Sequence, residues 1–109
     1  MELIQHDPAS GTPLAEGKNV TVVPVQREGR TAAALFYFDR NGDTGKRELG
    51  VDSLLIVISG EGRVRSGGQI ADVKTGDMVI LPGGILHHIW TVDSAMSVAL
   101  ITLTGAVQT

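Results

Sequence analysis

The sequence predicts an all-β fold, a barrel or a sandwich of short strands. Apolar segments of strand length recur at intervals of roughly eight to twelve residues, and the 14 glycines of the chain punctuate them. Sustained helical periodicity over about twelve residues is not found in any segment. With 109 residues and 42% hydrophobic residues, the chain is long enough for one domain with a single core.

The N-terminal part of the chain predicts an arm that precedes the barrel. Residues 1–18 contain Pro8 and Pro13 among small and charged residues, and are expected to form an irregular arm or an edge strand. Residues 19–109 are expected to form the barrel domain. Its first two strands are predicted at 19–26 and 31–39, where Val, Ala and aromatic residues are frequent.

Turn signals divide the rest of the chain into six further strands. The segment Asp-Arg-Asn-Gly-Asp at residues 39–43 predicts a turn, and so does Gly-Glu-Gly at residues 60–62. Leu and Ile fill residues 53–59, which is typical of a strand that is covered on both faces. The six predicted strands are residues 53–59, 63–66, 69–73, 78–81, 87–92 and 96–103.

Composition excludes several classes of function. Nine basic against twelve acidic residues give a net charge of −3, so no basic surface for nucleic acid is expected. The absence of cysteine excludes disulfides, thiolate catalysis and cysteine metal sites. We see neither a signal-peptide pattern nor the ~20 apolar residues of a membrane helix. We therefore expect a cytoplasmic protein with no membrane partner.

A glycine-proline-histidine pattern lies between two of the predicted strands. Gly76 is followed by Pro82, Gly84 and His87 at a spacing that resembles the second sequence motif of the cupin superfamily. That motif usually ends in Asn four positions after the histidine, where this chain has Thr91. The resemblance extends over residues 48–103 and implies a single-domain jelly-roll β-barrel.

The first motif of the superfamily, which carries most of its metal ligands, is degenerate in this chain. Its closing glycine matches Gly60, which places the usual glutamate at Ser53. The two usual histidines would fall on Arg47 and Leu49 or, with a longer spacer, on Lys46 and Glu48. Since a transition metal needs several converging N or O donors, the resemblance implies a cupin without the usual metal centre.

Strand alternation predicts which side chains line the barrel interior. If His87 points inward, its strand neighbours at alternate positions do too, and the same rule applies to the strand that begins at Ser53. The expected ligand-binding residues are His87, Ser53, Leu55, Val57, Ile89 and Thr91. Because this set is largely apolar, we expect a small, largely apolar organic ligand, with His87 as the candidate functional residue.

Two alternatives remain open at this point. The first is a divalent-metal enzyme of oxygenase or isomerase type, in which His87 with Glu48 or Asp52 holds Mn, Fe, Ni or Zn. The second is a regulatory or accessory domain that acts through dimer contacts. Whether the protein is an enzyme at all is left open by the sequence, because one fold hosts many functions.

Two further groups of residues predict surface features. Arg63 and Arg65 share one face of a strand; an inward pair would bind an anion, whereas the rarity of buried arginine favours an outward pair beside Glu61 or Asp72. Trp90 is predicted to face outward, and so are three apolar residues of an earlier strand, Leu54, Ile56 and Ile58. We expect these four to form the surface of a homodimer.

Overall fold

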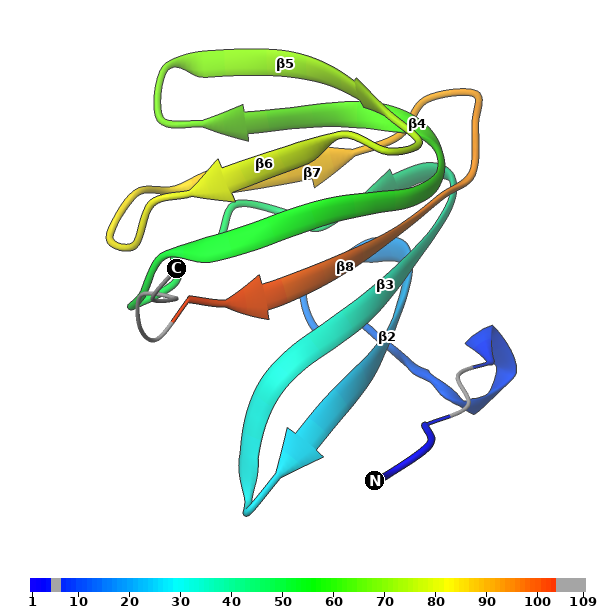
Figure 1. Cartoon of the computed structure of the whole chain (residues 1–109). Coiled ribbons are helices and arrows are strands. Elements are labelled where there is room, and N and C mark those ends of the chain that lie inside the picture. Colours follow the sequence, from blue (N-terminus) through cyan, green and yellow to red (C-terminus); the bar gives the residue numbers. More distant parts are fainter. Residues whose placement is uncertain (5–6, 104–109) are drawn as a thin grey trace.

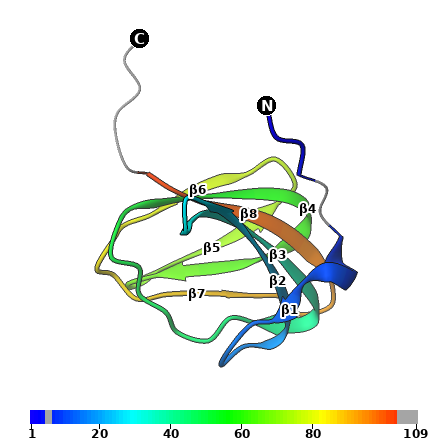
Figure 2. The same cartoon turned by 90° about the horizontal axis from the view of Figure 1, so that it is seen from below.

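The computed structural model describes residues 1–4 and 7–103 and shows a closed, all-β barrel (Figures 1 and 2). A short 3-10 helix, η1 (Pro8–Ser10), precedes the strands. The strands are β1 (Thr12–Pro13), β2 (Lys18–Arg27), β3 (Arg30–Asp43), β4 (Ser53–Ser66), β5 (Gln69–Lys74), β6 (Met78–Leu81), β7 (His87–Trp90) and β8 (Met96–Thr102). The predicted fold class is therefore confirmed.

Strand β4 runs through two parts of the barrel. Its N-terminal half, residues 53–57, pairs with β6 on one side and β8 on the other. Its C-terminal half, residues 61–66, pairs with β5 and β7. Strand β8 continues the larger part of the sheet through β3, β2 and β1, and all of these pairings are antiparallel. Figure 1 shows β4 curving from the neighbourhood of β8 toward β5.

A bulge, not a turn, separates the two halves of β4, so the prediction of a turn at residues 60–62 is wrong. The register with β8 shifts between Val57 and Ser59, and Gly60 has φ 80°. This irregularity reverses the alternation, because Leu55 and Val57 are buried before it and Val64 is buried after it. The Gly-rich segment thus bends the strand without ending it.

The turn predicted at residues 39–43 is also wrong, because β3 continues to Asp43. Asn41 takes φ 54° within the strand, and the register with β2 shifts between Lys18 and Val20. Asn tolerates this left-handed conformation, so the segment forms an irregularity inside a long strand. The extension matters because Asp43 pairs with Trp90, which joins β3 to β7.

The hydrophobic core fills the interior between the two parts of the sheet. Its buried members are Val20, Phe38, Leu55, Val57, Val64, Val73, Leu81, Ile89, Met96 and Val98. Burial of one such side chain contributes about 1.5–3 kcal/mol. Within the described residues, none of the helical structure is long and apolar enough to cross a membrane.

Candidate functional site

His87 is the first residue of β7 and points into the barrel interior. It lies opposite Ser66 of β4 on one side and opposite Arg47 on the other. Two backbone hydrogen bonds, His87 N to Arg47 O at 2.8 Å and Arg47 N to His87 O at 2.9 Å, fix this register. Only 4% of His87 is exposed, as the alternation along β7 predicts.

The imidazole of His87 is buried, and it has no hydrogen-bond or ion-pair partner among residues 1–4 and 7–103. Burial lowers its pKa from the ordinary value of 6.5, and the charges of Arg47 and His88 lower it further. The ring is therefore neutral near pH 7, with one nitrogen as donor and the other as acceptor. A neutral imidazole with no partner among the described residues can bind a hydroxyl, a carbonyl or a carboxylic acid.

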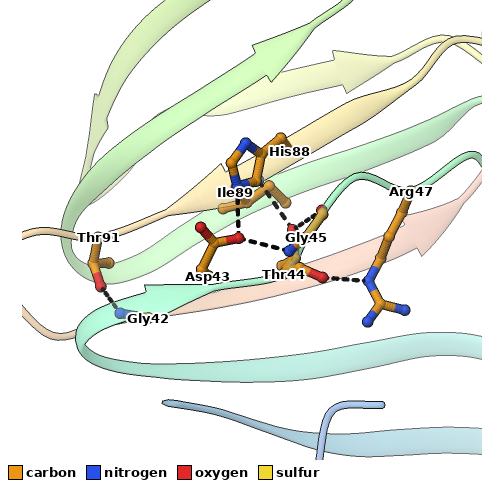
Figure 3. A network of polar contacts seen from close by, with 8 residues as sticks. All are labelled: Gly42, Asp43, Thr44, Gly45, Arg47, His88, Ile89 and Thr91. Atoms are coloured by element: carbon orange, nitrogen blue, oxygen red, sulfur yellow. Dashed lines mark hydrogen bonds and ion pairs between the residues drawn. The ribbon is translucent and has the colours of Figure 1, made fainter. Parts of the chain in front are cut away.

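The other residues predicted to bind the ligand are placed in the packed core. Ser53, Leu55, Val57, Ile89 and Thr91 are 0–3% exposed. The hydroxyl of Thr91 accepts a hydrogen bond from Gly42 N at 2.9 Å (Figure 3). It also donates to Asp39 O at 2.6 Å. It holds the irregular end of β3 against β7. Contact of these residues with a ligand stays a prediction.

A cavity of about 450 Å³ opens beside the C-terminal half of β4. Its lining comes from β4, β5, β6 and the residue after β6: Val64, Ser66, Gln69, Ile70, Ala71, Val79, Ile80 and Pro82. Val64 is buried, whereas Ile70 and Ile80 are 60% and 62% exposed, so the cavity runs from the interior to the surface. His87 is not among the residues that line this cavity, but Ser66, which does line it, lies directly opposite His87 in the β4–β7 pair.

Sequence reasoning missed this cavity because it depends on the path of two other strands. Strands β5 and β6 follow one another along a single edge of β4, and the bulge at Gly60 turns their inner faces toward each other. The sequence did contain a pattern that predicts the inward wall of the cavity, because Val64 and Ser66 alternate with Arg63 and Arg65. It indicated an inward-facing pair in the C-terminal half of β4.

Arg47, one of the two alternative positions expected for a metal-binding histidine of the family, lies opposite His87. Its Nε donates to Thr44 O at 2.8 Å, and its Nη2 donates to Ala15 O, so the side chain fastens the β1–β2 turn to the barrel. A guanidinium beside the imidazole repels a metal cation. In the part of the chain that the structure describes, there is no group of three His, Cys, Asp or Glu side chains able to hold a metal ion.

The two carboxylates considered as metal ligands are both exposed. Asp52 Oδ1 accepts a hydrogen bond from Gly83 N at 2.8 Å, which holds the loop before His87, and Glu48 is likewise at the surface. The residues around His87 therefore do not fit the transition-metal site of the family. The metal-free state itself stays a prediction.

Arg63 and Arg65 face outward, as predicted. Arg63 Nε lies 3.0 Å from Asp72 Oδ1, in an ion pair whose side chains are 54% and 82% exposed. Arg65 Nε donates to the carbonyl of Gly67 at 3.2 Å. Neither side chain lines the 450 Å³ cavity.

The outer face of β7 carries a polar network (Figure 3), and its residues lie opposite these two arginines of β4. His88 Nε2 lies 2.6 Å from Asp43 Oδ1, which also accepts from Gly45 N at 2.6 Å. The His88 ring stacks on Trp90 with 4.6 Å between ring centroids. His87 and His88 together line a smaller cavity of about 180 Å³, whose other lining residues are Lys46, Arg65, Gly67 and Leu86.

The predicted grouping of Trp90 with Leu54, Ile56 and Ile58 is wrong. Trp90 lies opposite Arg63 in the C-terminal half of β4, whereas Leu54 and Ile56 lie opposite residues of β6 and β8. The bend of β4 places them on outer faces of different parts of the barrel. Trp90 therefore belongs to the charged surface of β5, β4 and β7.

Comparison with known proteins shows which family model and which solved structures this barrel resembles. Residues 53–105 match the model of the AraC-like ligand binding domain. A cupin superfamily protein from Desulfitobacterium hafniense has a similar structure, with TM-score 0.71 and 20% identity over 95% of this chain and 97% of that one. A cupin-like protein from Thermotoga maritima gives TM-score 0.73 and 20% identity, with 89% and 79% of the two chains covered.

A third solved structure of similar fold is the polyketide cyclase RemF from Streptomyces resistomycificus. It has TM-score 0.72 and 14% identity, and the alignment covers 93% of this chain and 79% of that one. None of the curated proteins matches the sequence. The matched family model and the shared fold support a cupin-type ligand-binding barrel for this chain.

Proposed function

We propose that this cupin binds a small, largely apolar organic molecule in the 450 Å³ cavity, with His87 as its hydrogen-bonding group. The observation that carries the proposal is the composition of that cavity. Six of its eight lining residues are apolar, Ser66 and Gln69 are the polar ones, and none is charged. Its volume lies within the range of roughly 300–1,000 Å³ that is usual for ligand pockets.

The lining also indicates which ligands are disfavoured. A sugar phosphate would bury several polar groups against apolar walls, at about 1–3 kcal/mol for each group left unpaired. A compact phenol, ketone, alcohol or uncharged acid leaves one or two polar groups, which Ser66, Gln69 and the neutral imidazole of His87 can satisfy. This class of ligand fits both the cavity and the protonation state of His87.

Thermal-shift measurements test the proposal with a panel of 4-methylphenol, cyclohexanone, hexanoic acid and glucose 6-phosphate. We expect the first three to raise the melting temperature more than the phosphate does, and His87→Leu to weaken the effect. His88→Leu is the matched control, because it makes the same change one residue further, on the opposite face of β7. A panel in which glucose 6-phosphate stabilises most, or in which both variants behave alike, would refute the proposal.

The enzyme alternative is decided by metal analysis of the same samples. A metal-dependent oxygenase or isomerase would carry near-stoichiometric Mn, Fe, Ni or Zn that His87→Leu removes. One similar structure is that of a predicted oxalate decarboxylase from Thermotoga maritima, at 19% identity. Since Arg47 faces His87, we expect far less than one equivalent of metal in this chain.

We further propose that the chain forms a homodimer, without nucleic acid or membrane as partners. Exposed apolar side chains support the dimer, with Ile58, Met78 and Ile80 at 45%, 67% and 62% exposure. Sedimentation equilibrium at micromolar concentration should give about twice the chain mass of 11.5 kDa. The cytoplasmic location expected from the sequence stays a prediction.

A further inference from the structure

The outer face of the larger part of the sheet is apolar across five adjacent strands. Neighbouring strands β6, β4, β8, β3 and β2 are in register, so their outward residues form continuous rows. We call this set the apolar sheet face: Met78, Ile80, Leu54, Ile56, Ser97, Ala99, Ile101, Ala33, Leu35, Tyr37, Thr21, Val23 and Val25. None of these residues is charged.

Burial on the inner face of the same strands supports the conclusion that the residues of the apolar sheet face point outward. Leu55, Val57, Val98 and Phe38 occupy the alternate positions and are 0–2% exposed. The outward residues of β4, β8, β3 and β2 are all half-buried, as neighbouring side chains of one open sheet face would be. A strand set that is apolar on both faces needs cover on the second face as well.

Among residues 1–4 and 7–103, the segments outside the face cover only one end of the apolar sheet face. The backbone of the N-terminal arm packs on β2, since a Cβ added at Gly11 would lie 2.5 Å from Thr21 Cγ2 and 3.0 Å from Val23 Cγ2. Figure 2 shows η1 and β1 on the β2 side of the barrel, away from β6. The part formed by β6, β4 and β8 is left uncovered by the described residues of the arm.

The dimensions of the apolar sheet face suit a dimer contact. Five strands about 4.8 Å apart, with outward residues about 6.8 Å apart along each, give a flat area of about 400–500 Å². With side-chain relief and a polar rim, such an area approaches the ~800 Å² per partner of a standard interface. Without any charge, the face has no complementarity for an acidic or basic partner, whereas it is complementary to itself.

We infer that the occupant of the apolar sheet face is a second copy of this chain, which packs sheet on sheet about a two-fold axis near Ala99 of the central strand β8. This inference rests on the proposed homodimer and specifies its interface; Ile80 is the one residue of the face that also lines the 450 Å³ cavity. It excludes the surface of Trp90, Arg63 and His88 from the contact. Two such faces pack about 10 Å apart with their strands inclined by roughly 30°.

Sedimentation velocity of the full chain over a dilution series tests this inference. Ala99→Lys should raise the dissociation constant of the dimer at least about 30-fold, because it places two like charges near the two-fold axis. Leu35→Lys is a second variant on the same face. Val92→Lys is the control, because Val92 is 50% exposed and lies outside the apolar sheet face, so it should leave the dimer unchanged.

Circular dichroism confirms that each variant is folded, and Ile58→Lys at the exposed margin of the face replaces any variant that is not. A wild-type monomer at 100 µM, a concentration we set as about the upper limit for a functional dimer, would overturn both the interface and the homodimer. A dimer that survives Ala99→Lys and Leu35→Lys, or is lost in Val92→Lys, would overturn the interface alone. The change in melting temperature that 4-methylphenol causes in the same samples tests ligand binding separately from dimerisation.

Discussion

The two halves of β4 are one continuous strand with two different environments. In the N-terminal half, Leu55 and Val57 are packed in the core, and Leu54 and Ile56 look out onto the apolar sheet face. In the C-terminal half, the inward Val64 and Ser66 line a 450 Å³ cavity, and the outward side chains are charged. The bulge at Gly60 separates the two environments.

This difference assigns separate tasks to the two halves. The N-terminal half is apolar on both faces. Its inner face packs in the core, and its outer face is proposed to pack on the partner subunit. The C-terminal half alternates between a hollow interior and a solvated exterior, which is the pattern of a wall between a ligand and water. We therefore expect stability and the proposed assembly to depend on the first half, and the proposed ligand binding on the second.

The largest effect is expected where the two halves meet. Gly60→Ala forces a residue with a side chain into φ 80° and brings its Cβ to within 2.0 Å of Ala95 O. We expect a loss of about 3 kcal/mol in the free energy of unfolding, measured by urea titration. Gly68→Ala is the control: nothing lies within 4 Å of its Cβ, so it should be nearly neutral. Equal effects would mean that the bend is not imposed by Gly60.

A Val→Ala substitution in each half of β4 should lower the free energy of unfolding by different amounts, because the interior is packed beside one half and hollow beside the other. Val57→Ala removes methyl groups from a fully packed site and should cost about 2–3 kcal/mol. Val64→Ala should cost about 1 kcal/mol, because it only enlarges an existing water-accessible cavity. Urea titrations of both variants give the comparison. A larger cost for Val64→Ala would show that the cavity is filled by packing in solution.

The pH dependence of stability should originate beside the C-terminal half. The pKa of His87 is lower in the folded protein than its ordinary value of 6.5, so the unfolded chain binds more protons below that pH. Stability should therefore be complete above about pH 6.5 and decrease as the pH falls through the folded pKa. His87→Gln should flatten the slope between pH 7 and 5. A slope unchanged in His87→Gln would contradict the burial of a neutral imidazole.

The smallest effect is expected on the charged exterior. Arg63→Ala breaks an exposed ion pair with Asp72, so the free energy of unfolding should fall by less than about 1 kcal/mol, and less still in high salt. Thermal unfolding at low and high salt measures this. A loss of several kcal/mol that salt does not reduce would place Arg63 in a buried network.

The sequence predicted the parts of this structure that follow local rules. Alternation placed Ser53, Leu55, Val57, His87, Ile89 and Thr91 inside, and the Gly76–His87 motif selected the correct barrel. It failed at residues 39–43 and 60–62, because Gly and Asn form bulges within strands by the same conformations that form turns. The cavity and the position of Trp90 depend on which strands pair with each part of β4, and local patterns do not encode that.

The central claim is that the ligand enters beside the C-terminal half of β4 and not the N-terminal half. Titration of the ¹⁵N-labelled chain with 4-methylphenol tests it directly by two-dimensional NMR. We predict saturable shifts of the amides of Val64, Ser66 and Ala71, with the amides of Leu55 and Val57 unmoved. Saturable shifts confined to Leu55 and Val57 or to the outer face around Trp90, or no saturable shift at all, would contradict the account.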